Sequence, residues 1–69
     1  MLDDRKIEII LAMAECNMSM TSVSKKLHFH RNNVLYHCKQ IHEKTGLNPR
    51  SFYDLVKLVE VVKDGDGND

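Results

Sequence analysis

The stretch that decides the fold runs from Thr21 to Gly46 and reads TSVSKKLHFHRNNVLYHCKQIHEKTG. Thr21 is a typical N-cap residue, and it precedes a short segment in which Val23 and Leu27 lie four residues apart on one helical face. Residues 28–30 leave room only for a tight connection to a longer helical segment, which ends at Gly46 with a left-handed C-cap. A short capped helix, a tight turn and a longer helix are the parts of a helix-turn-helix unit.

Helical periodicity predicts further helices on both sides of this unit. The four expected helices span about residues 4–16, 22–28, 31–44 and 50–63. The expected fold class is therefore all-α, a four-helix domain that contains the helix-turn-helix. The predicted core consists of Ile7, Ile10, Leu11, Ala14, Val23, Leu27, Val34, Cys38, Ile41, Leu55, Val59 and Val62. Ile9 and Met13 lie off this stripe, so the first helix either packs against two neighbours or contributes to a dimer contact.

The charges are unevenly distributed along a chain whose net charge is zero. Residues 1–15 carry a balance of −2, and residues 54–69 carry a balance of −3. Residues 16–53 contain six basic residues against Glu43 alone, together with all four histidines. A basic centre between acidic ends is the electrostatic footprint of a surface that binds a polyanion.

The outer face of the expected third helix is polar and rich in hydrogen-bonding groups. In the major groove, arginine can pair with guanine and asparagine with adenine. The residues expected to read bases, or to support that reading, are Arg31, Asn32, Asn33 and Tyr36. The residues expected to contact the DNA backbone are Thr21, Ser22, Lys25, Lys26, His30, Lys39, Lys44 and Arg50. The sequence thus predicts double-stranded DNA as the partner.

A longer motif carries a family resemblance. Residues 30–36 read HRNNVLY, and they are followed by Ile41, Glu43, the triplet Thr-Gly-Leu at 45–47, and Arg50. This pattern resembles the C-terminal helix-turn-helix domain of the purine-catabolism and sugar-diacid (PucR/CdaR-type) regulators. That family's signature is His-Arg-Asn-Thr-Leu, a Tyr two residues on, an Ile, an acidic residue and Thr-Gly-Leu.

The resemblance covers about residues 17–62 and carries functional implications. It implies sequence-specific DNA binding by a domain of a bacterial transcription regulator, with the third helix in the major groove. Such domains sit at the C-terminus of longer chains whose upstream part senses a ligand, so we expect an excised domain or a truncated or stand-alone relative. A homodimer is expected in the full-length regulator. Asn33 stands where the family usually has Thr, which bears on base preference and not on the fold.

The domain organisation and the absence of catalysis follow from size and motif content. One domain at most fits in 69 residues, and we expect residues 1–63 to form the helix-turn-helix domain and residues 64–69 a disordered acidic tail. No Ser or Cys has a His and an acid at suggestive spacing, and no Gly-rich phosphate loop is present. We therefore expect no enzyme, no catalytic residue, no cofactor and no small-molecule site.

Metal binding and membrane insertion are not expected either. Cys16 and Cys38 lack paired spacing, and the histidines do not converge as zinc ligands do, so we interpret them as ordinary surface or turn residues. No apolar run approaches the roughly 20 residues of a membrane span, and no signal peptide is present. We expect a cytoplasmic protein with reduced thiols and no membrane partner.

The alternative function is a helical protein–protein interaction or dimerisation module that does not bind DNA. The two-sided first helix and the broad apolar face of the fourth helix favour it. The outer face of the third helix argues against it, because a partner-binding face would carry apolar anchors. The two functions are compatible if spare apolar residues hold two copies together. The candidates for that contact are Ile9, Met13, Leu58 and Val61.

Overall fold

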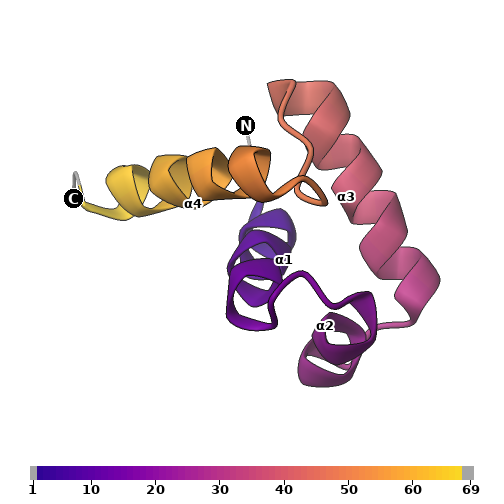
Figure 1. Ribbon diagram of the computed structural model, residues 1–69. Helices are drawn as coiled ribbons and strands as arrows, with labels where there is room; N and C mark the ends of the chain where they lie inside the picture. The colour runs from indigo at the N-terminus through magenta and orange to yellow at the C-terminus, as the bar shows by residue number, and fades with distance from the viewer. Residues whose placement is uncertain (1, 68–69) are drawn as a thin grey trace.

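The computed structural model describes the backbone of residues 2–67 and the side chains of residues 2–63, and it contains four α-helices (Figure 1). They are α1 (Asp4–Glu15), α2 (Met20–Leu27), α3 (Arg31–Thr45) and α4 (Phe52–Gly67). Residues 2–67 contain no strand, so the predicted all-α fold class is confirmed. None of the helices in this range combines the length and apolar character that crossing a membrane requires.

The first helix lies at the centre of the molecule. It packs against each of the other three helices, whereas α3 and α4 do not contact each other (Figure 1). The sequence left two explanations for the apolar residues on more than one side of α1, namely packing within the domain or a dimer contact. Packing against several neighbours is enough to account for them. The predicted stripe is wrong in part, because Ile7 and Leu11 are only half-buried and Ala14 is exposed. A helix with neighbours on three sides has no single inner stripe that periodicity could identify.

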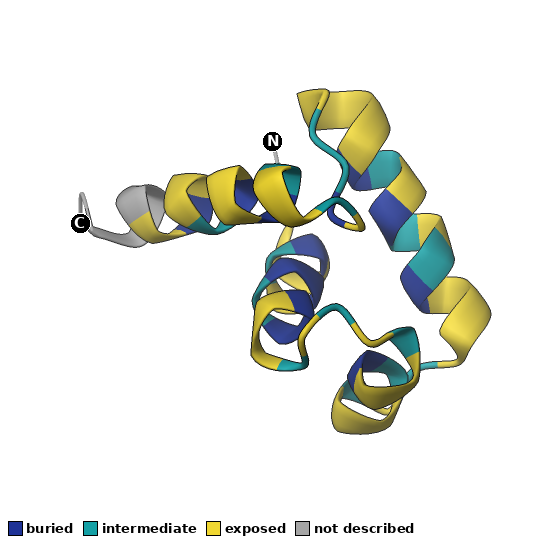
Figure 2. Cartoon of the chain, viewed as in Figure 1, coloured by how far each residue is buried: buried dark blue, intermediate teal, exposed yellow. Residues whose placement is uncertain are grey.

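The core is formed where the other helices meet α1, and their outer faces are exposed (Figure 2). Its buried apolar residues are Ile9, Ile10, Ala12, Met13, Val23, Val34, Cys38, Ile41, Leu55, Leu58 and Val62. The core predicted for α3 is confirmed in full. Leu27 and Val59 are half-buried, and Leu58 is buried instead of facing outward.

The second helix begins two residues earlier than the sequence indicated. Its N-cap is Ser19, whose Oγ accepts a hydrogen bond from the backbone N–H of Ser22 at 3.3 Å. Thr21, the expected N-cap, lies inside the first turn, where its carbonyl accepts a hydrogen bond from the hydroxyl of Ser24. Both Ser19 and Thr21 are good N-cap residues, so local propensity does not distinguish between them.

The connection from α3 to α4 is held by hydrogen bonds of its own. Gly46 adopts the predicted left-handed C-cap conformation, with φ of 76°. The Asp54 carboxylate accepts a hydrogen bond from the backbone N–H of Asn48 at 3.0 Å. The Asn48 side-chain oxygen accepts from the backbone N–H of Arg50 at 2.9 Å. These two bonds fix the turn, and α4 starts at Phe52 instead of near Arg50.

The C-terminal boundary also differs from the expectation. The helix was expected to end near Lys63, but the backbone remains helical to Gly67. Residues 68–69 lie outside the described residues, as do the side chains from residue 64 onward. A disordered acidic tail at 64–69, and the domain boundary at 63, therefore stay predictions.

Candidate nucleic-acid interface

The turn between α2 and α3 determines how α3 is presented. His28 ends α2 in the left-handed conformation, with φ of 58°, and His30 is the N-cap of α3. The Nδ1 atom of His30 accepts a hydrogen bond from the backbone N–H of Asn32 at 3.1 Å. An imidazole that accepts at Nδ1 carries its proton on Nε2. His30 can therefore cap the helix and still donate to an external acceptor.

Every residue that the sequence predicted to contact DNA is exposed. This set comprises Thr21, Ser22, Lys25, Lys26, His30, Arg31, Asn32, Asn33, Tyr36, Lys39, Lys44 and Arg50. On α3, where successive residues are about 100° apart, Asn32 and Tyr36 point away from the buried side. Arg31 and Asn33 lie on opposite flanks of Asn32. The four predicted base-reading residues thus form the exposed N-terminal part of α3 without all sharing one direction.

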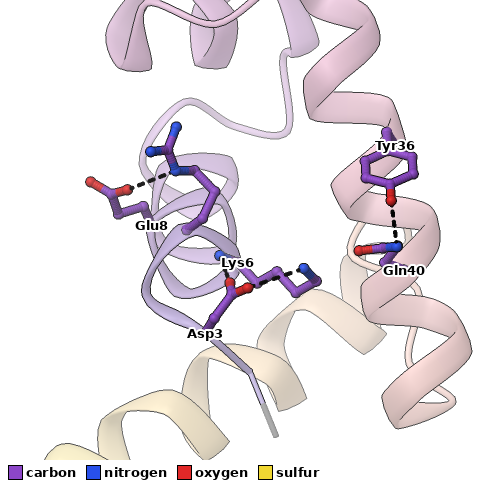
Figure 3. Close-up of polar contacts among 6 residues, drawn as sticks. Asp3, Lys6, Glu8, Tyr36 and Gln40 are labelled. Atoms are coloured by element: carbon purple, nitrogen blue, oxygen red, sulfur yellow. Dashed lines mark hydrogen bonds and ion pairs between the residues drawn. The ribbon is translucent and has the colours of Figure 1, made fainter.

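Tyr36 is held in place by a partner that the sequence prediction did not include. The Gln40 side-chain nitrogen donates a hydrogen bond to the Tyr36 hydroxyl oxygen at 2.7 Å (Figure 3). The Tyr36 ring is 56% exposed and meets the His37 ring edge-on. Residues four apart are neighbours on a helix, so the spacing of Tyr36 and Gln40 in the sequence could have indicated this pair. The pair leaves the tyrosine proton and the amide oxygen free for an external hydrogen-bonding partner.

The charges around α3 favour its N-terminal half as the binding end. Glu43 is the single acidic residue of this helix, and it lies near the C-terminal end. The helix dipole adds partial positive charge at the N-terminus, where Arg31 is exposed. Lys26 is paired with Glu15 at 3.1 Å, which reduces its availability for a phosphate. In the part of the chain with described side chains, no ion pair involves Lys25, Lys39, Lys44 or Arg50.

A polar cluster lies where the N-terminus of α1 meets α3. The Lys6 side chain is almost fully buried, and its ammonium lies 3.4 Å from the Asp3 carboxylate (Figure 3). The backbone N–H of Lys6 donates to Asp3 at 2.9 Å, and this bond, with a smaller effect of the ammonium, lowers the pKa of Asp3. Asp3 is thereby the N-cap of α1.

His37 lies near this cluster on the side of α3 that packs against α1. It is half-buried, and among the described residues its buried Nδ1 atom has no hydrogen-bond partner. Burial lowers the pKa of His37, with a further contribution from the Lys6 ammonium. The expectation of an ordinary surface histidine is wrong at this position. The lowered pKa favours the uncharged imidazole, which is the form compatible with a neighbouring buried ammonium.

Two features bear on reactive or metal-binding side chains within residues 2–63. Burial raises the pKa of the Cys38 thiol to about 11, so it stays protonated inside the core. Within residues 2–63, no group of three His, Cys, Asp or Glu side chains is placed to hold a metal ion. The arrangement around α3 can form hydrogen bonds and ion pairs with a polar, anionic surface.

Comparison with known proteins identifies a family. A family model described as the PucR C-terminal helix-turn-helix domain matches residues 7–60. No curated protein and no solved structure matches the chain. The matched range includes the whole of α2 and α3 and most of α1 and α4, so it covers far more than half of the chain.

Proposed function

The chain belongs to the PucR C-terminal helix-turn-helix family, and from that premise we propose that it binds double-stranded DNA sequence-specifically within a bacterial transcription regulator. In this proposal the N-terminal half of α3 lies in the major groove. The observation that carries the proposal is the exposed, hydrogen-bonding start of α3, held by a connection capped at both ends. A cytoplasmic location is part of the proposal, because bacterial DNA lies there.

The proposed roles follow the directions of the side chains on α3. Asn32 and Tyr36, the latter supported by Gln40, read base edges directly. Arg31 and Asn33 reach the neighbouring base pairs or the edges of the groove. The proposed backbone contacts are Thr21, Ser22, Lys25, Lys26, His30, Lys39, Lys44 and Arg50. Lys26 is the weakest of these, because Glu15 competes for its charge.

The number of available cations predicts weak binding by a single copy. Three or four phosphate contacts give a slope of log affinity against log salt concentration of about −3. With so few contacts we expect dissociation constants of about micromolar or weaker at physiological salt. Useful affinity then requires two copies on half-sites about 34 Å apart. Homodimerisation is therefore part of the proposal.

The surface that the sequence indicated for a dimer contact is not available. Ile9, Met13 and Leu58 are buried, and Val61 alone of the four candidates is exposed. The exposed large apolar residues of α4 are instead Phe52, Tyr53, Val56 and Val61. Of these, Phe52 and Val56 line a groove of about 460 Å³ between α1 and α4, which is also lined by the exposed Glu60 and Lys63.

We assign this α4 face to a second copy of the chain. A two-fold axis can place Glu60 of each copy against Lys63 of the other, which makes the face self-complementary in charge. Because α4 does not contact α3, such a dimer leaves the proposed DNA-binding face open. The test is sedimentation: Glu60→Lys and Lys63→Glu should each weaken association, and the double variant should restore it. A chain that stays monomeric at millimolar concentration excludes this assignment without affecting the DNA-binding proposal.

The DNA-binding proposal is tested by selecting bound duplexes from a random pool and then titrating the best half-site. Chemical-shift changes on adding the selected duplex should cluster at residues 30–40. Arg31→Ala should lose about 1–3 kcal/mol of binding free energy and relax the preference at one base pair. Changes that cluster on α4 and spare residues 30–40 would show that the base-reading residues are wrongly assigned, whereas the protein-interaction alternative, which the exposed Phe52 and Tyr53 favour, predicts that no duplex is bound. Enrichment of no duplex at all would also contradict the proposal.

A further inference from the structure

A hollow of about 320 Å³ lies on the flank of α3, beside the proposed base-reading face. The residues that line it are Leu35, Cys38, Lys39, His42, Asn48 and Arg50. Three of these six carry basic side chains, and none is acidic. The floor is formed by Cys38, whose thiol is buried.

The turn after α3 brings Arg50 to this hollow. Pro49 is fully buried and anchors the turn, while the side-chain oxygen of Asn48 holds the backbone N–H of Arg50 at 2.9 Å. The positive charge of Arg50 lies close enough to Cys38 to partly counteract the rise in the pKa of that thiol. The guanidinium therefore lies near the side of α3 that carries Cys38.

The two basic residues of α3 at the hollow line it together with Arg50. Lys39 and His42 are three residues apart and so are neighbours on one face of the helix. Two acidic residues are near in sequence, but neither lines the hollow. Glu43 follows His42 and is exposed on the outer face, while Asp54 is hydrogen-bonded to the backbone N–H of Asn48.

We propose that this hollow binds one phosphate group of the DNA backbone, shared by Lys39, His42 and Arg50. The inference rests on the proposed function, because α3 in the major groove places its flank beside one strand. It adds His42 to the binding residues, and it replaces two independent contacts of Lys39 and Arg50 by a single shared one. Ammonium, guanidinium and imidazole N–H groups are all donors that suit a phosphate oxygen.

The salt dependence of binding distinguishes one shared phosphate from two separate ones. Each neutralised phosphate contributes a slope of about −0.9 in log affinity against log salt. The double variant Lys39→Gln/Arg50→Gln should therefore make the slope shallower by about 0.9, measured on a selected duplex. The matched control is Lys25→Gln/Lys44→Gln, two exposed lysines outside the hollow, for which a loss of about 1.8 is expected. A loss of about 1.8 in both pairs would overturn the proposal while leaving DNA binding intact.

Neutral methylphosphonate linkages, placed one at a time along the duplex, locate the phosphate. Binding by the unmodified protein should weaken wherever a neutral linkage replaces a contacted phosphate. At one of these positions, Lys39→Gln, His42→Gln and Arg50→Gln should each reduce affinity for the modified duplex by less than they reduce affinity for ordinary DNA. If the three variants instead depend on three different positions, the shared site is wrong. If no duplex binds under any condition, the proposed function itself fails, and the shared phosphate fails with it. Circular dichroism of each variant confirms that the helices are intact.

Discussion

The helices α1 and α3 are of similar length but are used in opposite ways. Four of the twelve residues of α1 are buried apolar side chains, together with the buried Lys6, and every other helix packs against it. In α3 only three of fifteen residues are buried, and its outer face consists of polar groups. The difference teaches that stability and the proposed DNA binding reside in different helices, so substitutions should change one property without the other.

The largest expected effect is on α1. Ile10→Ala removes a fully buried side chain at the centre of the fold, which should lower the free energy of unfolding by about 2–5 kcal/mol. Chemical denaturation measures this, with the exposed Val61→Ala as the control that should change little. Equal losses in the two variants would show that α1 is not the centre of the core.

The next effect in size is on the outer face of α3. Asn32→Ala should weaken binding to the selected duplex by about 1–3 kcal/mol. The melting temperature should be almost unchanged, because the side chain is exposed and the backbone N–H that caps α3 is retained. Titration and thermal denaturation of one sample give both numbers, with Lys57→Gln on α4 as the control. An Asn32→Ala variant with a lowered melting temperature and unchanged affinity would show that this residue of α3 contributes to stability and not to binding.

A smaller effect is expected where the two helices meet. Burial lowers the pKa of His37 in the folded chain, whereas the unfolded chain titrates near the ordinary histidine value of about 6.5. Below that pH the unfolded chain binds more protons than the folded one, so stability falls as the pH falls from about 6.5 to the folded pKa and then levels off. His37→Gln should reduce this pH dependence, and His28→Gln should not. Melting temperatures between pH 5 and pH 8 measure it.

The smallest effect is expected at the exposed contact between α1 and α2. Glu15→Gln removes the partner of Lys26, and an exposed ion pair contributes about 0.2–1 kcal/mol at most. Stability should therefore change little, while affinity for DNA should rise slightly because Lys26 is freed. A marked loss of stability would show that this pair, and not apolar packing alone, holds α2 in place.

The buried side of α3 and its C-cap were predictable from the sequence, whereas the N-cap of α2 and the ends of α4 were not. Val34, Cys38 and Ile41 are spaced so that one side of α3 must be buried, and Gly46 is suited to a left-handed C-cap. The neighbours of α1 were not predictable, because Ile9 and Met13 on one side and Ile7 and Leu11 on the other are equally apolar. Only the tertiary arrangement determines which of these sides is fully enclosed.

At the candidate site, the exposure of the side chains was predictable, whereas their pairing was not. Exposure of Arg31, Asn32 and Tyr36 follows from the position of the buried stripe. The pairing of Lys26 with Glu15 and the burial of His37 against Lys6 depend on contacts between helices that are distant in sequence. The periodicity of the α3 sequence carries no information about such contacts between helices.

The position of α4 has a consequence for the way in which the molecule opens. This helix is held by α1 alone, whereas α1, α2 and α3 each contact the other two. Local unfolding proceeds in cooperative units that detach where few apolar contacts must be broken. The amide hydrogens of α4 should therefore exchange with deuterium through detachment of this one helix. Those of α1–α3 should exchange only when the whole domain unfolds.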